Sequence, residues 1–312
     1  MSLPRKASKL TNSSGTRRRE RYDREEVLWG FLLIAPTVIG ISIFALWPLA
    51  QSVYLSFTSW SVFGQVQWTG AANYARLLSD PEVLGALQNT IVLSVATVTG
   101  TVVIATLFAV LLNVGVRGTS VYRVLLFLPV VTMPAASAMV WKWLYNSEFG
   151  LLNAALQLVG IDGPSWLTDK STALWSVAAV VIWNEIGISM IILLAGLQGI
   201  SRTLYEAAHL DGAGPIATFF NITLPLLTPT LFFVIVTSII SAFQMFDVIF
   251  LMIGPEGYAL ESTQTLIYLF YEQGFILGNK GYAAAIVLVL FVIIALITAF
   301  QFQAQKRWVH YQ

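Results

Sequence analysis

The chain has 312 residues, of which 57% are hydrophobic and only 11% charged, and its formal net charge is +1. A soluble domain carries about 25% charged residues, so this composition excludes an ordinary soluble fold and indicates a polytopic membrane protein. The sequence has no cysteine, which excludes disulfides and thiolate metal sites, and its two histidines, His209 and His310, do not form a ligand cluster.

Residues 1–26 are polar and rich in arginine, and no short apolar core with a small-residue cleavage site follows them. We therefore expect a basic cytoplasmic tail that acts as a topology signal, not a cleaved leader. Nucleic-acid binding is the weaker interpretation, because basic residues beside a first span usually hold that end of the chain inside.

Six apolar segments follow, each longer than the roughly 20 residues that a helix needs to cross the ~30 Å hydrocarbon core. They cover residues 27–49, 90–116, 121–143, 174–197, 226–253 and 282–302. The segments are continuously apolar instead of alternating, which favours helices over a β-barrel. The predicted fold is an all-α membrane protein with six transmembrane helices over residues 27–305 and a cytoplasmic tail at 306–312.

The positions of the charged and aromatic residues predict the orientation. Most of the 17 lysines and arginines fall on the inner side if residue 1 is cytoplasmic, while Trp47, Trp60, Trp68 and Trp175 fall at the outer boundary. We therefore expect both termini in the cytoplasm. Between the first two spans, Tyr74, Leu77 and Leu78 indicate a helix that lies at the outer interface.

Polar residues interrupt the later spans at two depths. Trp183, Asn184 and Glu185 lie near the middle of the fourth span, and a carboxylate at that depth should face a cavity or a partner and not lipid. Glu185 is either a substrate contact or a buried hydrogen-bonding partner of another helix. Gln244, Phe246 and Asp247 lie in the fifth span, where Asp247 could touch substrate, gate the outer mouth or hold the helix ends.

Two prolines, Pro129 and Pro134, are expected to kink the third span and to free backbone carbonyls, which is consistent with a transport pathway. The small residues of the second span, such as Gly100, indicate close packing against another helix.

Residues 201–225, between the fourth and fifth spans, are too polar to cross a bilayer yet are patterned like folded structure. The Thr203–Glu206 spacing predicts a capped short helix that ends at Asp211–Gly212. A second short helix is expected at 216–222, and Pro225 marks the return to the membrane. The segment is either a simple surface connector or a docking helix offered to a partner protein.

The loop residues Glu206-Ala207-Ala208, Gly212 and Ile222-Thr-Leu-Pro225 resemble the EAA loop of binding-protein-dependent ABC importer permeases, in the carbohydrate-uptake branch with the maltose-transporter membrane subunits. The likeness continues along nearly the whole chain, for example at Trp47-Pro48 and Gly281-Tyr282. It implies the type I ABC importer transmembrane architecture and a cytoplasmic loop that inserts into a cleft of an ATP-hydrolysing subunit.

The resemblance also implies partners and site residues. The expected partners are a second homologous permease, two ATPase subunits that bind ATP-Mg, an extracytoplasmic solute-binding protein and a sugar-type substrate, in a bacterial or archaeal plasma membrane. The residues expected to couple to the ATPase are Glu206, Ala207, Ala208, Asp211, Gly212, Ala213, Leu224 and Pro225. The residues expected along the substrate pathway are Trp183, Asn184, Glu185, Gln244, Phe246 and Asp247.

Other functions fit the sequence less well. No Gly-x-x-x-x-Gly-Lys-Ser/Thr phosphate loop occurs, so we expect no ATP hydrolysis by this chain alone, no directly bound cofactor and no catalytic residues. An ion-coupled secondary transporter, with Glu185 or Asp247 carrying protons, is the alternative, although no inverted repeat is evident. A membrane enzyme would need a convergent catalytic group, and none stands out.

Overall fold

The computed structural model describes residues 24–60, 66–114 and 118–308. Residues 1–23 of the predicted basic tail and residues 309–312 of the predicted C-terminal tail lie outside the described residues. The elements, in chain order, are α1 (Arg24–Ile41), η1 (Ser42–Leu46), α2 (Trp47–Ser56), β1 (Thr58–Trp60), β2 (Val66–Trp68), α3 (Ala72–Ser79), α4 (Pro81–Asn113), α5 (Thr119–Val131), α6 (Pro134–Leu144), α7 (Leu151–Gln157), α8 (Ala173–Gln198), α9 (Arg202–Leu210), α10 (Pro215–Thr218), η2 (Phe219–Thr223), α11 (Leu224–Phe243), α12 (Asp247–Met252), α13 (Leu260–Thr263), α14 (Leu266–Tyr271), η3 (Glu272–Ile276) and α15 (Lys280–Trp308).

Five helical segments in the described part of the chain are long and apolar enough to cross a membrane. They are Leu28–Ser56, Pro81–Asn113, Ala173–Gln198, Pro215–Phe243 and Lys280–Lys306. The pair α5 and α6 makes a sixth span if the two are taken together, although they meet at an angle of 99°. The all-helical, six-span fold class is thereby confirmed.

The chain divides into two compact units, and the first ends at Gln51. Its described part consists of α1, the π-helical turn η1 and the start of α2, with Pro36 inside α1. None of the most apolar window of this first span is buried. A helix that is apolar on all sides and uncovered is typical of a segment that meets lipid or another membrane helix.

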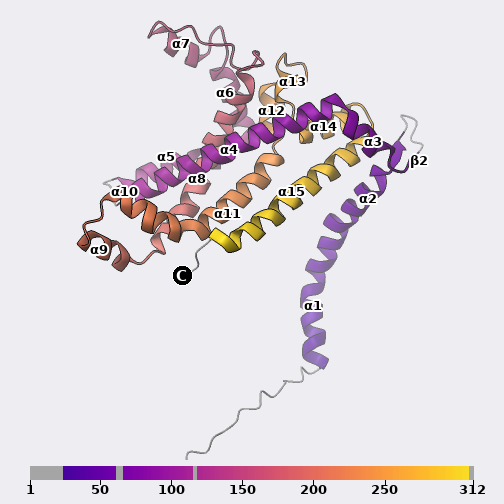
Figure 1. Ribbon diagram of the computed structural model, residues 1–312. Coiled ribbons are helices and arrows are strands. Elements are labelled where there is room, and N and C mark those ends of the chain that lie inside the picture. The colour runs from indigo at the N-terminus through magenta and orange to yellow at the C-terminus, as the bar shows by residue number, and fades with distance from the viewer. Residues whose placement is uncertain (1–23, 61–65, 115–117, 309–312) are drawn as a thin grey trace, which may run out of the picture. The chain divides into compact units, whose positions relative to one another are not determined.

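In the second unit, α8 is the helix against which α4, α5 and α11 pack, and α4 and α11 run alongside each other (Figure 1). The buried residues Met190, Leu193 and Leu194 of α8 form a core with α4 and α11. At Gly187, α8 meets α5 so closely that a Cβ atom there would lie 2.5 Å from the carbonyl oxygen of Leu126. Glycine permits this approach of two backbones because it has no side chain.

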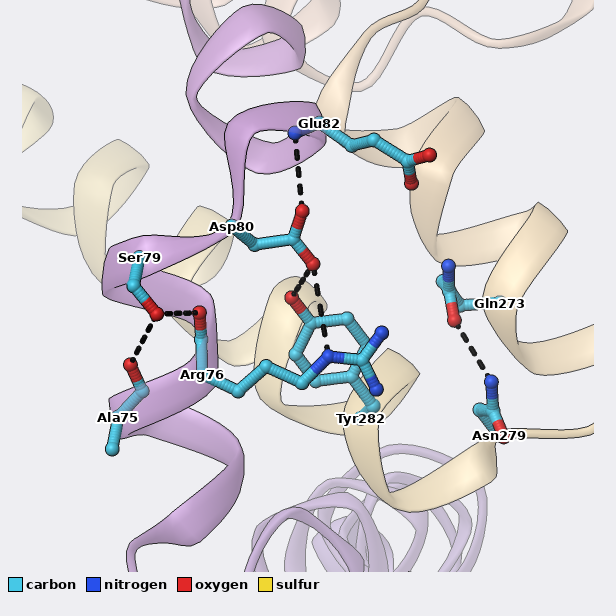
Figure 2. Close-up of polar contacts among 8 residues, drawn as sticks. All are labelled: Ala75, Arg76, Ser79, Asp80, Glu82, Gln273, Asn279 and Tyr282. Atoms are coloured by element: carbon cyan, nitrogen blue, oxygen red, sulfur yellow. Dashed lines mark hydrogen bonds and ion pairs between the residues drawn. The ribbon is translucent and has the colours of Figure 1, made fainter.

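An aspartate joins three elements of the second unit at one point. Asp80 caps α4 by accepting a hydrogen bond from the Glu82 N–H at 3.1 Å, and it accepts a second from the Tyr282 hydroxyl of α15 at 2.6 Å (Figure 2). Arg76 of α3 lies 3.7 Å from the same carboxylate and stacks over the Tyr282 ring at 4.0 Å. This cluster therefore fixes α3, α4 and the start of α15 against one another.

Several boundaries differ from the sequence prediction. The second span begins at Pro81 and not near Thr90, because Asp80 and Pro81 form a strong helix start. The predicted separate helix at 216–222 is wrong: α10, η2 and α11 form one helix from Pro215 to Phe243. The π-helical turn η2 ends at Thr223, two residues before Pro225, and the helix continues through this proline.

The expected interface helix is α3, in which Leu77 is buried but Leu78 is 77% exposed, so the two do not share a face. Adjacent residues on a helix point about 100° apart, which explains the difference. The antiparallel pair of β1 and β2 and the short helices α13 and α14 were not anticipated by the hydropathy pattern.

Candidate functional site

Two helices of the second unit are interrupted at non-helical residues. The first break lies between α5 and α6 at Thr132 and Met133, and the second lies between α11 and α12 at residues 244–246. At the first break, the Pro129 carbonyl accepts two hydrogen bonds from Thr132, one from its hydroxyl at 2.6 Å and one from its backbone N–H at 3.2 Å, so this carbonyl is satisfied at the bend. Irregular backbone at membrane depth is tolerated where it lines a cavity or is satisfied in this way.

Both breaks open onto one cavity of about 320 Å³ that also includes the middle of α8. The lining residues are Pro129, Val130, Thr132, Pro134, Val181, Asn184, Glu185, Ser241, Gln244, Met245, Phe246, Asp247 and Val248. The volume lies at the lower end of the range for small-molecule sites. The cavity therefore has the place and the mixed polar and apolar lining of a solute site between broken helices.

The structure brings five of the predicted pathway residues together: Asn184, Glu185, Gln244, Phe246 and Asp247 all line this cavity. Trp183 is not among the lining residues. Its ring instead meets Trp141 of α6 edge-on, with centroids 5.4 Å apart, and 38% of the residue is exposed. Its neighbour Asn184 lies about 100° further round α8, which is why the two side chains face different surroundings.

Two further contacts organise the cavity wall. The Ser137 hydroxyl of α6 donates to the amide oxygen of Asn184 at 3.2 Å. Phe246 packs against Phe250 and Tyr271, with ring centroids 5.1 and 4.9 Å away. Sequence reasoning missed Ser137, Thr132 and Ser241. Only their proximity to the predicted kink and to Gln244 could have pointed to them.

The residues predicted to couple to an ATPase lie on and after α9. The predicted capping box is wrong: the helix begins at Arg202 with Ser201 as N-cap, and no side-chain hydrogen bond caps it. The Thr203 hydroxyl pairs with that of Ser201 at 2.8 Å instead of accepting from a backbone N–H. The predicted end is observed, since Asp211 is the C-cap and Gly212 has a φ of +76°. Glycine adopts this left-handed conformation without strain.

The exposure of the loop candidates separates them into three groups. Glu206, Ala207, Asp211 and Gly212 are exposed, whereas Ala208 is buried. Ala213, Leu224 and Pro225 are half-buried. The Tyr205 hydroxyl lies 3.2 Å from that of Thr223 and holds α9 against the following helix. Leu210 and Ile216, which flank the turn, are 87% and 74% exposed, so the loop presents uncovered apolar surface beside its acidic residues.

Comparison with known proteins gives three findings. Residues 102–310 match the family described as binding-protein-dependent transport system inner membrane component. The chain is 35% identical over 304 residues to the probable ABC transporter permease protein YesP of Bacillus subtilis (strain 168), covering 96% of this chain and 98% of the relative. It is 36% identical over 285 residues to the sn-glycerol-3-phosphate transport system permease protein UgpA of Agrobacterium fabrum (strain C58 / ATCC 33970), covering 90% and 96%.

The fold is also similar to a chain in the crystal structure of a bacterial alginate ABC transporter in complex with alginate pentasaccharide-bound periplasmic protein. The TM-score is 0.80 at 23% identity, covering 91% of this chain and 95% of that chain. The helices, their breaks and the loop between α8 and α11 thus define a permease of the type I ABC importer class. The chain belongs to the family of binding-protein-dependent transport system inner membrane components.

Proposed function

We propose that this chain is the permease subunit of an ATP-driven importer of a sugar-type solute: a disaccharide, an oligosaccharide, or a related polyol or glycerol phosphate. The observation that carries the proposal is the cavity in which Asn184, Glu185, Gln244 and Asp247 meet between two broken helices. Amide and carboxylate groups form hydrogen bonds with sugar hydroxyls, and the Phe246 ring offers an apolar face against which the carbon atoms of a sugar ring can pack. The names of similar proteins mention sn-glycerol 3-phosphate and alginate, which are both polyhydroxy compounds, and this supports a hydroxyl-rich solute without fixing its charge.

The energy for uptake comes from two partner ATPase subunits that bind ATP-Mg, because no phosphate loop occurs in this chain. The segment that contacts one of these ATPase subunits consists of α9 and the turn at Gly212. In this segment, the exposed Glu206 and Asp211 lie near the exposed apolar side chain of Leu210. A short helix with apolar anchors and charged neighbours suits a groove on another protein. Closure of the ATPases moves this helix and rocks the spans between inward-facing and outward-facing states.

Two other partners complete the importer. A second homologous permease supplies the other wall of the cavity, and an extracytoplasmic solute-binding protein delivers the solute. The complex resides in the plasma membrane of a bacterium or archaeon, with both termini and α9 in the cytoplasm, as the distribution of lysine and arginine indicates. Leu28–Ser56, an apolar span without buried residues in its most apolar window, has the surface required to meet lipid or a second permease.

The test is transport by the complete complex. The chain is co-expressed with its neighbouring permease, ATPase and binding-protein genes, purified as a complex and reconstituted in proteoliposomes. We expect uptake of a labelled sugar only when ATP-Mg and the binding protein are both present. Failure of an ATPase subunit to co-purify, or uptake by this chain alone driven by an ion gradient, would overturn the proposal and favour a secondary transporter.

A further inference from the structure

We infer that Glu185 and Asp247 form an anionic filter in the cavity, and that the permease passes an uncharged sugar or polyol and rejects phosphorylated or carboxylated ones. The inference rests on the proposed function, because it specifies the charge of the solute admitted by the same cavity. It narrows the proposal, which leaves neutral sugars and glycerol phosphate equally open.

The charged groups of the cavity have one sign. Within the part of the chain that the structure describes, the ionisable residues lining the cavity are Glu185 and Asp247, and no lysine, arginine or histidine joins them. Proteins bind phosphate and carboxylate ligands with arginine or lysine side chains or with backbone N–H groups. An ionised carboxyl group repels an anion, and a protonated one can donate a single hydrogen bond to it but brings no positive charge.

Helix ends do not compensate for this charge. The N-terminus of α6, at Pro134, reaches the cavity and carries about half a positive charge, but the C-terminus of α5 lies directly before it with the opposite sign. At the second break, Asp247 itself occupies the first turn of α12, so its carboxylate already offsets the positive end of that short helix. The balance of charges and dipoles in this wall of the cavity is therefore negative.

The remaining polar groups suit hydroxyl-bearing solutes. Asn184 and Gln244 supply amides that both donate and accept hydrogen bonds, and Thr132 and Ser241 supply hydroxyls. The two carboxylates accept hydrogen bonds from sugar hydroxyls, which donate readily. Phe246, held in place by Phe250 and Tyr271, provides a rigid apolar surface for ring carbons. Such a lining recognises a neutral polyhydroxy compound without any group to neutralise an anion.

The experiment uses the reconstituted importer with its binding protein and two matched pairs of labelled solutes: glycerol and sn-glycerol 3-phosphate, and galactose and galacturonate. Binding of each solute to the binding protein is measured first, and uptake is measured at saturating concentration. We expect ATP-dependent uptake of a neutral member with uptake of its anionic partner near background. Equal or faster uptake of an anionic member would overturn the inference, for instance because the second permease contributes a cation.

A double variant tests the two carboxylates directly. Glu185→Gln with Asp247→Asn keeps the shapes of the side chains and removes their charge. We expect uptake of the anionic partner, relative to the neutral one, to rise about tenfold, as the loss of two nearby charges in a partly buried site predicts. The matched control is Glu148→Gln with Asp162→Asn, two exposed carboxyl groups outside the cavity, which should leave the ratio unchanged.

The outcomes separate this inference from the function on which it rests. An unchanged ratio in the double variant, in a complex that still takes up the neutral solute, removes the filter while sugar import stands. Absence of ATP-dependent uptake for a neutral solute that the binding protein binds contradicts sugar import itself, and the inference falls with it.

Discussion

The hydroxyl of Ser137 donates a hydrogen bond to the amide oxygen of Asn184 at 3.2 Å, so a residue of α6 sets the orientation of an amide on α8. Ser137 is buried, and Asn184 lines the cavity between the two broken helices. An amide held through its oxygen presents its nitrogen as a hydrogen-bond donor. This contact therefore connects the shape of the α5–α6 bend to the chemistry that the cavity offers a solute.

Removing the amide should impair transport more than removing the hydroxyl that orients it. We expect Asn184→Ala and Gln244→Ala to lower uptake at least about fivefold, because each loses a hydrogen bond worth roughly 1 kcal/mol or more in a partly buried site. Ser137→Ala should give a smaller loss. Uptake is measured in cells together with the amount of assembled complex. Ser79→Ala, an exposed serine that bonds only to its own helix, is the control. Unchanged uptake in Asn184→Ala and Gln244→Ala would take both residues out of the pathway.

The loop after α9 provides a test of coupling to ATP hydrolysis. We expect Glu206→Lys and Gly212→Pro to leave the chain inserted but to abolish solute-stimulated ATP hydrolysis and uptake. The first reverses an exposed charge, and the second cannot adopt the φ of +76° observed at this position. Gly212→Ala should show a weaker defect, since a left-handed alanine costs about 1–2 kcal/mol.

Gly214→Ala is the matched control for the loop. Its φ is −72°, and a Cβ atom there would meet nothing within 4 Å, so we expect normal coupling. Normal uptake by both Glu206→Lys and Gly212→Pro would speak against a docking role for the loop.

The Asp80–Tyr282 hydrogen bond should contribute to stability and not to solute recognition. Tyr282→Phe removes the hydroxyl that donates to Asp80 and retains the ring over which Arg76 lies. A hydrogen bond to a charged group contributes about 1.5–3 kcal/mol, so the purified protein should melt at a lower temperature. The apparent affinity for solute should stay the same. A variant that melts like the parent chain but takes up solute with altered affinity would contradict this assignment.

The close approach of α5 and α8 at Gly187 should not tolerate a methyl group. Gly187→Ala places a Cβ atom against the Leu126 carbonyl oxygen, and overpacking of this kind typically costs about 1–3 kcal/mol. We expect a lower melting temperature and reduced uptake, because α5 carries one edge of the bend at Thr132.

The control for Gly187 is Gly85→Ala, a helical glycine of α4 with open space around it. That change should leave the melting temperature unchanged or raise it, since alanine favours the helix by roughly 1 kcal/mol. Equal effects of the two alanine substitutions would show that the contact with Leu126 is unimportant.

The fold class and the family could be predicted from the sequence because they depend on the apolar length of each segment and on short motifs of neighbouring residues. Apolar length alone identifies the spans, whatever their neighbours, and the turn at Gly212 depends on a few adjacent residues. The same local reasoning correctly predicted the kink at Pro129 and Pro134 but failed at Pro225. Pro129 and Pro134 flank a bend of 99°, yet a single helix runs through Pro225 and Pro229. A proline removes one backbone N–H donor, and whether the helix then bends or continues depends on its surroundings; the π-helical turn η2 ends two residues before Pro225.

From the amino-acid sequence alone, the membrane-spanning permease class and a folded polar loop between the fourth and fifth spans could be predicted. Only the tertiary structure decided which side chains share the cavity: it placed Asn184 and Glu185 opposite Gln244 and Asp247 and turned Trp183 towards Trp141 instead. The physical reason is that the rotation of each helix about its axis depends on packing over its whole length. The residues of the cavity, which are far apart in the chain, therefore come together only when α4, α5, α8 and α11 pack against one another.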